Sequence, residues 1–379
     1  MSDELKKLLA TQPSFRLKQI RTALFDPSIN SYTEITTLSK DLREKIKDMP
    51  WLVVKLKTIQ ESKIDDTKKA LLELKDGEMI ETVLMGREGR YTVCVSSQVG
   101  CSMACKFCAT GQFGFRRNLT VEEIVDQVRF WMRHAFVCHS EQSEESPTKA
   151  WDPSATPQDD GRKKITNIVL MGQGEPFLNY ENVKEAITII LDNTEIGPSK
   201  ITVSTVGIPA MLDKMLEDKN FPAVRLAISL HSALDNERGK IIPSHAKDFI
   251  SFLVDWAPRY HARFTSRALF LGLEYTMLAG VNDDDKHLKA LIKLASKMGR
   301  VRINLIPYNC SPDCQSKSSV IPNEVEESLP RSLPSFTGSP RETIEAWHGK
   351  LLKTGFVCTI RRSQGQDIAA ACGQLRNLN

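Results

Sequence analysis

The sequence lacks any long hydrophobic run. No window offers eighteen consecutive apolar residues, so no segment predicts a membrane-spanning helix. The first fifteen residues carry charged side chains throughout and hold no apolar stretch of signal-peptide length, which excludes the usual export signal. We therefore expect a cytoplasmic protein with no membrane association.

A strong charge imbalance is also missing. Among the 379 residues, 51 lysines and arginines stand against 47 aspartates and glutamates, which gives a net charge of +4. This mild excess permits nucleic-acid binding but falls short of a strongly basic composition. Hydrophobic residues make up 41% of the chain, which is enough for a proper core. The length allows one large domain with a smaller one attached.

A paired cysteine framework is absent too. The nine cysteines form an odd number in a large chain without an export signal, which disfavours a set of structural disulfides. Metal binding or thiol chemistry is then the better interpretation of any cluster. The cysteines are Cys94, Cys101, Cys105, Cys108, Cys138, Cys310, Cys314, Cys358 and Cys372.

The apolar pattern divides the chain in two. Residues 1 to about 80 place apolar side chains three and four apart, as in 15–25 and 35–47, which predicts helices. Thr37 and Ser39 are candidate caps of the second helix. The basic side chains between the apolar positions form either a solvated face or a phosphate-contacting face.

From about residue 90 the pattern changes to short β-rich runs that alternate with amphipathic helices. Such alternation predicts parallel βαβ units with an active site at the carboxyl ends of the strands. The predicted strands are 91–95, 165–171, 201–206, 223–230, 271–278, 301–306 and 356–360. The predicted helices between them include 121–136, 182–193, 284–298 and 341–355.

Two stretches interrupt this repeat, at about 138–163 and 311–340. Both are rich in Ser, Pro and acidic residues and show little apolar periodicity. We interpret them as surface insertions that need not fold. Cys138 and Cys314 lie within them and are not expected to be functional.

Three cysteines, Cys101, Cys105 and Cys108, have the spacing C-x3-C-x2-C after a predicted strand. Zinc prefers four ligands, usually in two separated pairs, and no second pair follows. A structural zinc loop would therefore need Cys94 or a histidine as its fourth ligand. A four-iron cluster held by three thiolates leaves one iron open, and an open iron is what the reductive cleavage of S-adenosylmethionine requires.

A glycine-rich segment, GQGEP at 172–176, follows the predicted strand 165–171. Glycines at a strand end let the backbone approach a ligand, and Glu175 is a candidate partner for the ammonium group of S-adenosylmethionine. Alone, this segment would predict a turn. Because it follows a cysteine cluster in a βα repeat, it predicts a cofactor site.

These motifs resemble those of the radical S-adenosylmethionine superfamily, whose C-x3-C-x2-C signature has an aromatic residue, here Phe107, before the last cysteine. Nearly the whole chain resembles one family within it, the adenine C2 methyltransferases of rRNA and tRNA. The matching segments are CVSSQVGCSMACKFCATGQFGFRRNL, VLMGQGEPFLN, SLHS with a following Arg, NLIPYN and QGQDIAAACGQL. A relative that methylates adenine C8 shares most of these segments and is the alternative.

The resemblance implies a radical route, because adenine C2 is too electron-poor to attack an electrophilic methyl group. In the family, one S-adenosylmethionine methylates a C-terminal cysteine, and a second yields a deoxyadenosyl radical that removes hydrogen from the S-methyl group. The thiomethylene radical adds to adenine, and a second thiol releases the product. By match of motifs, Cys372 carries the methyl group and Cys94 resolves the adduct, with a transient disulfide between them. Either Cys94 or Glu81, at the position of the family's proposed proton acceptor, removes the C2 proton.

The resemblance also implies the cofactor contacts. The three clustered cysteines bind one [4Fe-4S] cluster, and each turnover consumes two molecules of S-adenosylmethionine. Gly174 and Glu175 contact its methionine part. The other implied contacts are Ser204, Ser229, Leu230, His231 and Asn309. Arg116 and Arg117 are either phosphate contacts or a solvated pair, and Cys358 is expected to be a buried hydrophobic residue.

The implied fold is α/β, a partial (βα)6 barrel with a small N-terminal helical domain. We expect an RNA-binding accessory domain at 1–85 and the catalytic barrel with its C-terminal catalytic segment at 86–379. The implied substrates are 23S rRNA, in the peptidyl-transferase region, and tRNA, at the adenosine 3′ of the anticodon. The target base must leave its stack to enter the barrel.

The implied partners also include a flavodoxin-type or ferredoxin-type reductant for the cluster, and we expect a monomer. The rival hypothesis from another class is a non-catalytic iron–sulfur or zinc module that binds RNA. That hypothesis predicts that Cys94 and Cys372 are expendable.

Overall fold

The computed structural model describes residues 1–142, 164–310 and 336–376. Most of the two expected insertions, together with Cys314 and the side chain of Cys138, lies outside the described residues. Among the described helices, none combines the length and the apolar character that crossing a lipid bilayer requires.

One ten-stranded sheet organises the described part of the chain, in the order β1-β2-β3-β4-β7-β8-β9-β10-β11-β12. All neighbours from β4 to β12 pair in parallel. These strands are β4 Arg90–Cys94, β7 Lys164–Leu170, β8 Ile201–Thr205, β9 Arg225–Ser229, β10 Leu271–Met277, β11 Val301–Pro307 and β12 Val357–Ile360. They coincide with the seven predicted runs, so the predicted α/β class is confirmed.

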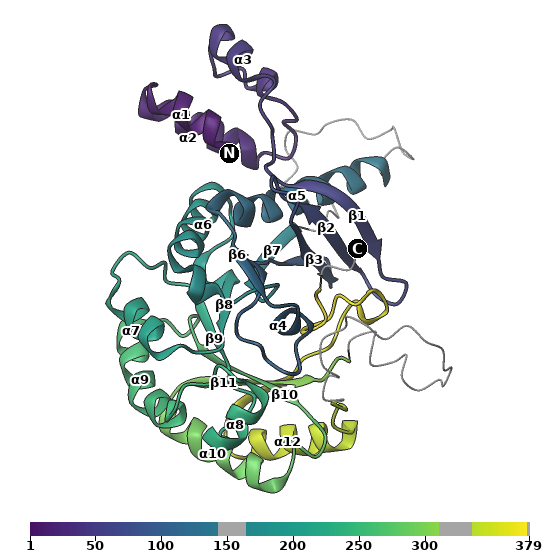
Figure 1. Ribbon diagram of the computed structural model, residues 1–379, viewed down its shortest axis with the longest axis vertical. Coiled ribbons are helices and arrows are strands. Elements are labelled where there is room, and N and C mark those ends of the chain that lie inside the picture. The colour runs from purple at the N-terminus through teal and green to yellow at the C-terminus, as the bar shows by residue number, and fades with distance from the viewer. Residues whose placement is uncertain (143–163, 311–335, 377–379) are drawn as a thin grey trace, which may run out of the picture.

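Helices connect the parallel strands and cover the outer face of the curved sheet (Figure 1). The sheet is open, because its order has two ends, β1 and β12. The four predicted helices of this region are all present. The outer helices are α5 Val121–Gln142, α6 Tyr180–Asn193, α7 Pro209–Glu217, α8 Asp235–Ile241, α9 Phe249–Arg263, α10 Asp285–Met298 and α12 Arg341–Lys353.

Interior strand β10 and helix α10 show why these residues form these elements. Every residue of β10 is buried, as expected for a parallel strand covered on both faces. Asp284 caps α10, since its side chain accepts a hydrogen bond from the backbone N–H of His287. The buried residues of α10 recur at helical spacing and include Leu288, Leu291 and Leu294.

The expectation of helices through about residue 80 is wrong beyond residue 46. Helices α1 (Asp3–Ala10), α2 (Ser14–Phe25) and α3 (Lys40–Ile46) are present, and Ser39 caps α3 by accepting from the backbone N–H of Leu42. The chain then forms three antiparallel strands that extend the barrel sheet. Their bounds are β1 Lys55–Glu61, β2 Thr67–Glu73 and β3 Met79–Arg87.

The missed strands carry a turn signal. Asp76 and Gly77 connect β2 to β3, and Gly77 has the positive φ of 84° that such a turn requires. The alternation that marks a strand is weak in β1, where six of the seven residues are exposed. An exposed edge strand needs few apolar side chains, so its pattern resembles that of a polar helix.

The three N-terminal helices bury their own apolar cluster, which is distinct from the core of the barrel. Figure 1 shows them at one end of the molecule, beside α5. Arg129 of α5 joins the two parts, since its guanidinium donates to the carbonyls of Leu24 and Trp51 at 2.9 and 2.8 Å. The helical unit is therefore anchored on the barrel through hydrogen bonds to its backbone.

Candidate active site

A cavity of about 140 Å³ opens at the carboxyl ends of the parallel strands. The loop between β5 (Gln98–Gly100) and α4 (Ala109–Phe113) closes one side of it. The predicted residues that line it are Cys101, Cys105, Cys108, Gly174, Glu175, Ser204, Ser229, His231 and Cys372. The structure thus brings together most of the predicted site from five separate segments of the chain.

The cysteine loop folds around a close backbone crossing at Gly100. This residue has φ of 72°, and a Cβ there would lie 1.8 Å from the carbonyl oxygen of Gly114. The crossing is held by the Cys101 N–H, which donates to that carbonyl at 2.8 Å, while the Cys108 N–H donates to the Cys105 carbonyl. The local chain therefore turns the three cysteines toward one cavity.

These thiols fit an iron–sulfur cluster better than a closed zinc site. Burial raises the pKa of the Cys101 thiol to about 12 and raises the pKa of Cys105 as well, so both need a cationic centre to ionise. Of the fourth zinc ligands that the sequence allowed, Cys94 does not line this cavity. His231 does, but its Nδ1 accepts from the Thr276 N–H, which leaves the proton on Nε2. Within the described ranges, no three His, Cys, Asp or Glu side chains gather as they would around a single metal ion.

Glu175 fastens the ends of two neighbouring strands. Its Oε1 accepts from the Phe177 N–H at 2.9 Å and its Oε2 accepts from the Val206 N–H at 2.7 Å. Burial raises the pKa of this carboxyl, although these hydrogen bonds oppose the rise. Both oxygens already hold backbone donors, so any contact with a ligand ammonium group would use their remaining lone pairs.

The glycine before it is required by the protein itself. Gly174 has φ of 101°, and a Cβ there would lie 2.5 Å from the Cβ of Gln98. The group that approaches Gly174 closely is therefore the protein segment that follows β4. The sequence had suggested that the glycine makes room for a ligand. The Glu175 N–H also donates to the Gln98 side chain at 2.8 Å, which ties the two segments together.

His231 is neutral and holds a strained backbone position. Burial lowers the pKa of its ring to about 3, and its Nδ1 accepts from the Thr276 N–H at 3.0 Å, which assigns the proton to Nε2. Its φ is 55°. The ring packs edge-on against Phe107 of the cysteine loop, with centroids 4.6 Å apart. His231 therefore positions the loop that carries the three thiols.

Ser204 and Ser229 stand at the ends of β8 and β9 with their hydroxyl oxygens 3.3 Å apart. Both line the cavity, as predicted. Leu230 is fully buried and does not line it; its N–H donates to the Glu274 carbonyl and its carbonyl accepts from Arg238. Its backbone therefore fixes the strand end, and its side chain belongs to the core.

Asn309 binds the C-terminal segment, residues 366–376, and does not line the cavity. Its Nδ2 donates to the Cys372 carbonyl at 3.3 Å, and its Oδ1 accepts from Gln366 at 2.9 Å. The Ala109 N–H donates to the Gly373 carbonyl at 2.8 Å. These bonds hold Cys372 against the cysteine loop.

Cys372 lies between two cavities. A second cavity, of about 50 Å³, is lined by Cys94, Cys372 and Arg361, and Cys372 presents exposed surface to both. Exclusion from bulk water raises the pKa of the Cys94 thiol to about 12 and raises the pKa of Cys372. Both are free thiols, so the expected disulfide between them is not present in this structure.

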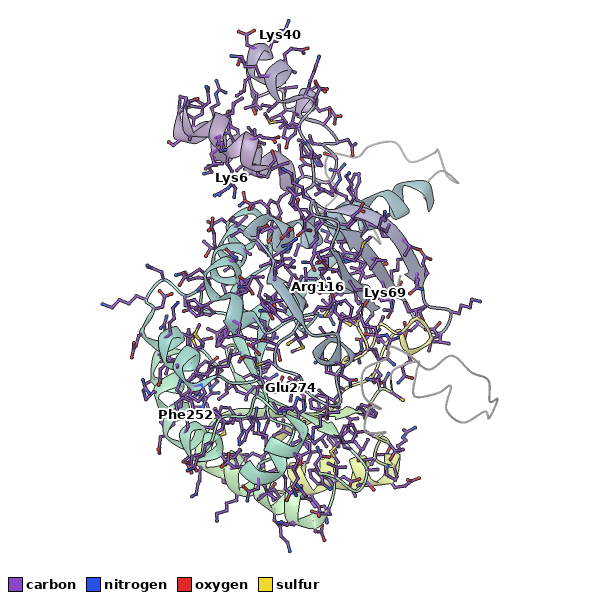
Figure 2. All side chains as sticks on the ribbon, in the orientation of Figure 1. Lys6, Lys40, Lys69, Arg116, Phe252 and Glu274 are labelled. Atoms are coloured by element: carbon purple, nitrogen blue, oxygen red, sulfur yellow. The ribbon has the colours of Figure 1, made fainter. Side chains whose placement is uncertain are left out.

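Two charged side chains that the sequence did not single out, the buried Glu274 and the partly exposed Arg361, stand beside these thiols. Glu274 of β10, labelled near the centre of Figure 2, lies 3.5 Å from the guanidinium of Arg361 and accepts from Asn304 at 2.6 Å. Burial is the largest single influence and lowers the pKa of Arg361, but Glu274 together with the Cys372 and Cys94 thiols raises it, and the net pKa is raised. The available signal was a single carboxylate within the apolar run 271–278.

Glu81 is not brought into either cavity. It lies on β3 and lines a third cavity of about 540 Å³, together with Cys310 and residues 366–369 of the C-terminal segment. Its Oε1 pairs with Lys69 at 2.9 Å. Since Cys372 lines the other two cavities, the C-terminal segment separates the predicted proton acceptor from the predicted methyl carrier.

The remaining sequence expectations concern Arg116, Arg117 and Cys358. Arg117 is held in ion pairs by Glu123 and Asp76, and Arg116 pairs with Glu78 at 3.2 Å (Arg116 is labelled in Figure 2). Cys358 is buried in the barrel core, as expected.

A solved relative shares this fold. The crystal structure of a radical SAM methyltransferase from Sphaerobacter thermophilus superposes with a TM-score of 0.77 at 33% identity, covering 98% of this chain and 96% of that one. No family model matches the chain. The fold and the cysteine site define a radical S-adenosylmethionine methyltransferase.

A curated relative narrows the class. The dual-specificity RNA methyltransferase RlmN of Marinobacter nauticus (strain ATCC 700491 / DSM 11845 / VT8) is 35% identical over 365 residues, which is 95% of this chain and 86% of that protein. The chain belongs to the RlmN family of methyltransferases.

Proposed function

We propose that this enzyme methylates C2 of adenine in 23S rRNA, in the peptidyl-transferase region, and in tRNA, at the adenosine 3′ of the anticodon. Family membership supports RNA as the substrate. The observation that carries the mechanism is the place of Cys372, which faces the three clustered cysteines in one cavity and Cys94 in the next. A methyl carrier needs access to both.

The cavity residues fit a [4Fe-4S] cluster and S-adenosylmethionine. Cys101, Cys105 and Cys108 would hold the cluster, and the strand ends with Ser204 and Glu175 would face the methionine part of the second cofactor. When bound, the two supply the methyl group and the radical chemistry that an electron-poor ring carbon requires. A flavodoxin-type or ferredoxin-type reductant would supply the electron.

The protein's own thiols then divide the work. Cys372 carries the methyl group, and hydrogen bonds from Asn309 to its carbonyl and from Ala109 to the carbonyl of Gly373 hold it in place. Cys94 lies on β4 in the adjoining cavity. Its thiolate would attack the Cys372 sulfur, so that a disulfide forms, the bond between that sulfur and the methylene carbon breaks, and its electron pair leaves on the product carbon, which then takes up a proton. Because burial raises the pKa of Cys94 to about 12, it needs a cation, and Arg361 lines the same cavity.

The accessory region at 1–85 is proposed to grip the RNA backbone, with the catalytic barrel at 86–379. Its helical part has its own core, whereas β1–β3 belong to the barrel sheet. Lys40 and Lys6, labelled in Figure 2, lie on this helical part. Lys6 pairs with Glu122 of the barrel at 2.7 Å, and Lys40 is exposed. The proposed substrates place the enzyme in the cytoplasm.

The test is nucleoside mass spectrometry. The protein is purified without oxygen, its cluster is reconstituted, and RNA treated with it and S-adenosylmethionine is digested. The matched variants are Cys372→Ala and Cys358→Ala, since Cys358 is a buried cysteine outside the site. We expect 2-methyladenosine from the wild type and Cys358→Ala and none from Cys372→Ala.

Two results would contradict the proposal. Production of 8-methyladenosine would assign the enzyme to the C8-specific chemistry of the same family. No methylated adenosine, with an intact and reducible cluster, would reject RNA as the substrate.

A further inference from the structure

Lys69 of β2 is a buried cation at the boundary between the N-terminal strands and the C-terminal segment. Its side chain is 10% exposed and that of its partner Glu81 is 4% exposed, with the two charges 2.9 Å apart. Burying an ammonium group is costly unless it is paired and hydrogen-bonded. Its placement therefore calls for an explanation beyond surface solvation.

The sheet register puts Lys69 and Glu81 on one face. β2 and β3 are antiparallel, and Leu71 lies opposite Glu81. Since side chains alternate between faces, Lys69, two residues from Leu71, shares the face of Glu81 and lies diagonal to it. Lys68 points to the other face, where it pairs with Glu61 at 2.8 Å.

The same ammonium group reaches the segment that carries Cys372. It donates to the carbonyl of Ala369 at 3.3 Å, across 300 residues of sequence. Figure 2 labels Lys69 beside the C-terminal segment, which is yellow there. Ala369 has φ of 51°, a left-handed conformation that costs a non-glycine residue about 1–3 kcal/mol and persists only where surrounding contacts hold it.

We propose that Lys69 is a positioning residue for methyl transfer to RNA, which orients Glu81 as the acceptor of the adenine C2 proton and holds the Cys372 segment on β2. This inference rests on the proposed function. One side chain would thus fix the positions of both the proton acceptor, Glu81, and the methyl carrier, Cys372, which line separate cavities.

The electrostatics of the Glu81 site agree with this role. Burial raises the pKa of Glu81, and Lys69 is the strongest opposing influence, followed by Arg376 of the C-terminal segment. The cavity is also lined by Asp367 and Cys310. Asp367 is engaged by the Ser62 hydroxyl and the Lys63 N–H, so it is directed at the turn between β1 and β2. Loss of the Lys69 charge should therefore leave Glu81 protonated to higher pH.

The experiment compares Lys69→Met, Lys69→Arg and the neighbouring Lys68→Met in the reconstituted enzyme. Single-turnover RNA methylation is followed against pH, and methylation of Cys372 without RNA is followed by intact mass. For Lys69→Met we expect RNA methylation to be slower by at least about tenfold. We also expect the pH at which the rate rises to move upward by about one unit or more, since a nearby opposite charge shifts a carboxyl pKa by that order. Lys69→Arg should restore that pH, and Lys68→Met should match the wild type.

A Lys69→Met enzyme with the wild-type pH profile would overturn the proposal, and so would a loss that Lys68→Met reproduces. Wild-type protein that makes no methyladenosine would instead refute the proposed function. Hydrogen exchange of residues 366–374 tests the Ala369 contact without turnover. It should be faster in Lys69→Met than in Lys68→Met, and equal exchange would remove the role in holding the segment. If Lys69→Met does not fold, Lys69→Gln takes its place.

Discussion

His231 should make the folded protein sensitive to acid. Burial lowers the pKa of its ring to about 3, whereas an unfolded histidine has a pKa of about 6.5. Because the unfolded state binds this proton more readily, the stability from neutral His231 is complete above the unfolded pKa and is lost as pH falls toward the folded pKa. At pH 5, about 1.5 pH units below the unfolded value, the loss is about 2 kcal/mol, at about 1.4 kcal/mol per unit.

The assay is urea unfolding of the wild type and His231→Gln, near pH 7.5 and near pH 5. The buried carboxyls Glu175 and Glu274 have raised pKa values, so their contributions have the opposite sign. They are present in both proteins and cancel in the difference. We expect the wild type to lose about 2 kcal/mol more than the variant between the two pH values. An equal loss in both proteins would refute the buried, neutral assignment of His231.

Two further predictions concern the backbone around the cavity. Glu175→Gln should destabilise the fold by about 2–4 kcal/mol in urea unfolding, because it turns a charge-assisted acceptor of the Val206 N–H into a facing donor; unchanged stability would show that the carboxylate does not tie the strands. Gly174→Ala should lower the melting temperature more than Gly77→Ala. Both have positive φ, but only Gly174 has a neighbour, Gln98, within 4 Å of a new Cβ, and equal losses would contradict the packing argument.

The barrel was predictable because its strands are buried. A parallel strand covered on both faces must be apolar along its length, and β10, with every residue buried, shows this pattern in the sequence. β1 lies at the edge of the sheet and is mostly exposed, so its residues carry little of the alternation that identifies a strand. Its place depends on pairing with β2, which a local pattern does not encode.

The candidate site was predictable where its chemistry is local. The cysteine spacing and the GQGEP segment are short motifs, and both line the cavity. The charges around them were not predictable, because each pairs with a group far away in sequence. Lys69 meets Ala369 across 300 residues, and Arg361 meets Glu274 from another strand end. The same holds for Asn309. Its motif predicted that it belongs to the site, but not that it binds the carbonyl of Cys372.

The most direct test of the central claim is the isotopic composition of the methylated adenine. The S-adenosylmethionine supplied carries a fully deuterated methyl group. If the methyl group is first transferred to Cys372 and then loses one deuterium to the deoxyadenosyl radical, the methyl group of the product should hold two deuterons. Its third hydrogen is supplied after the product is released. A product methyl that retains all three deuterons would show direct transfer of an intact methyl group and would contradict the account.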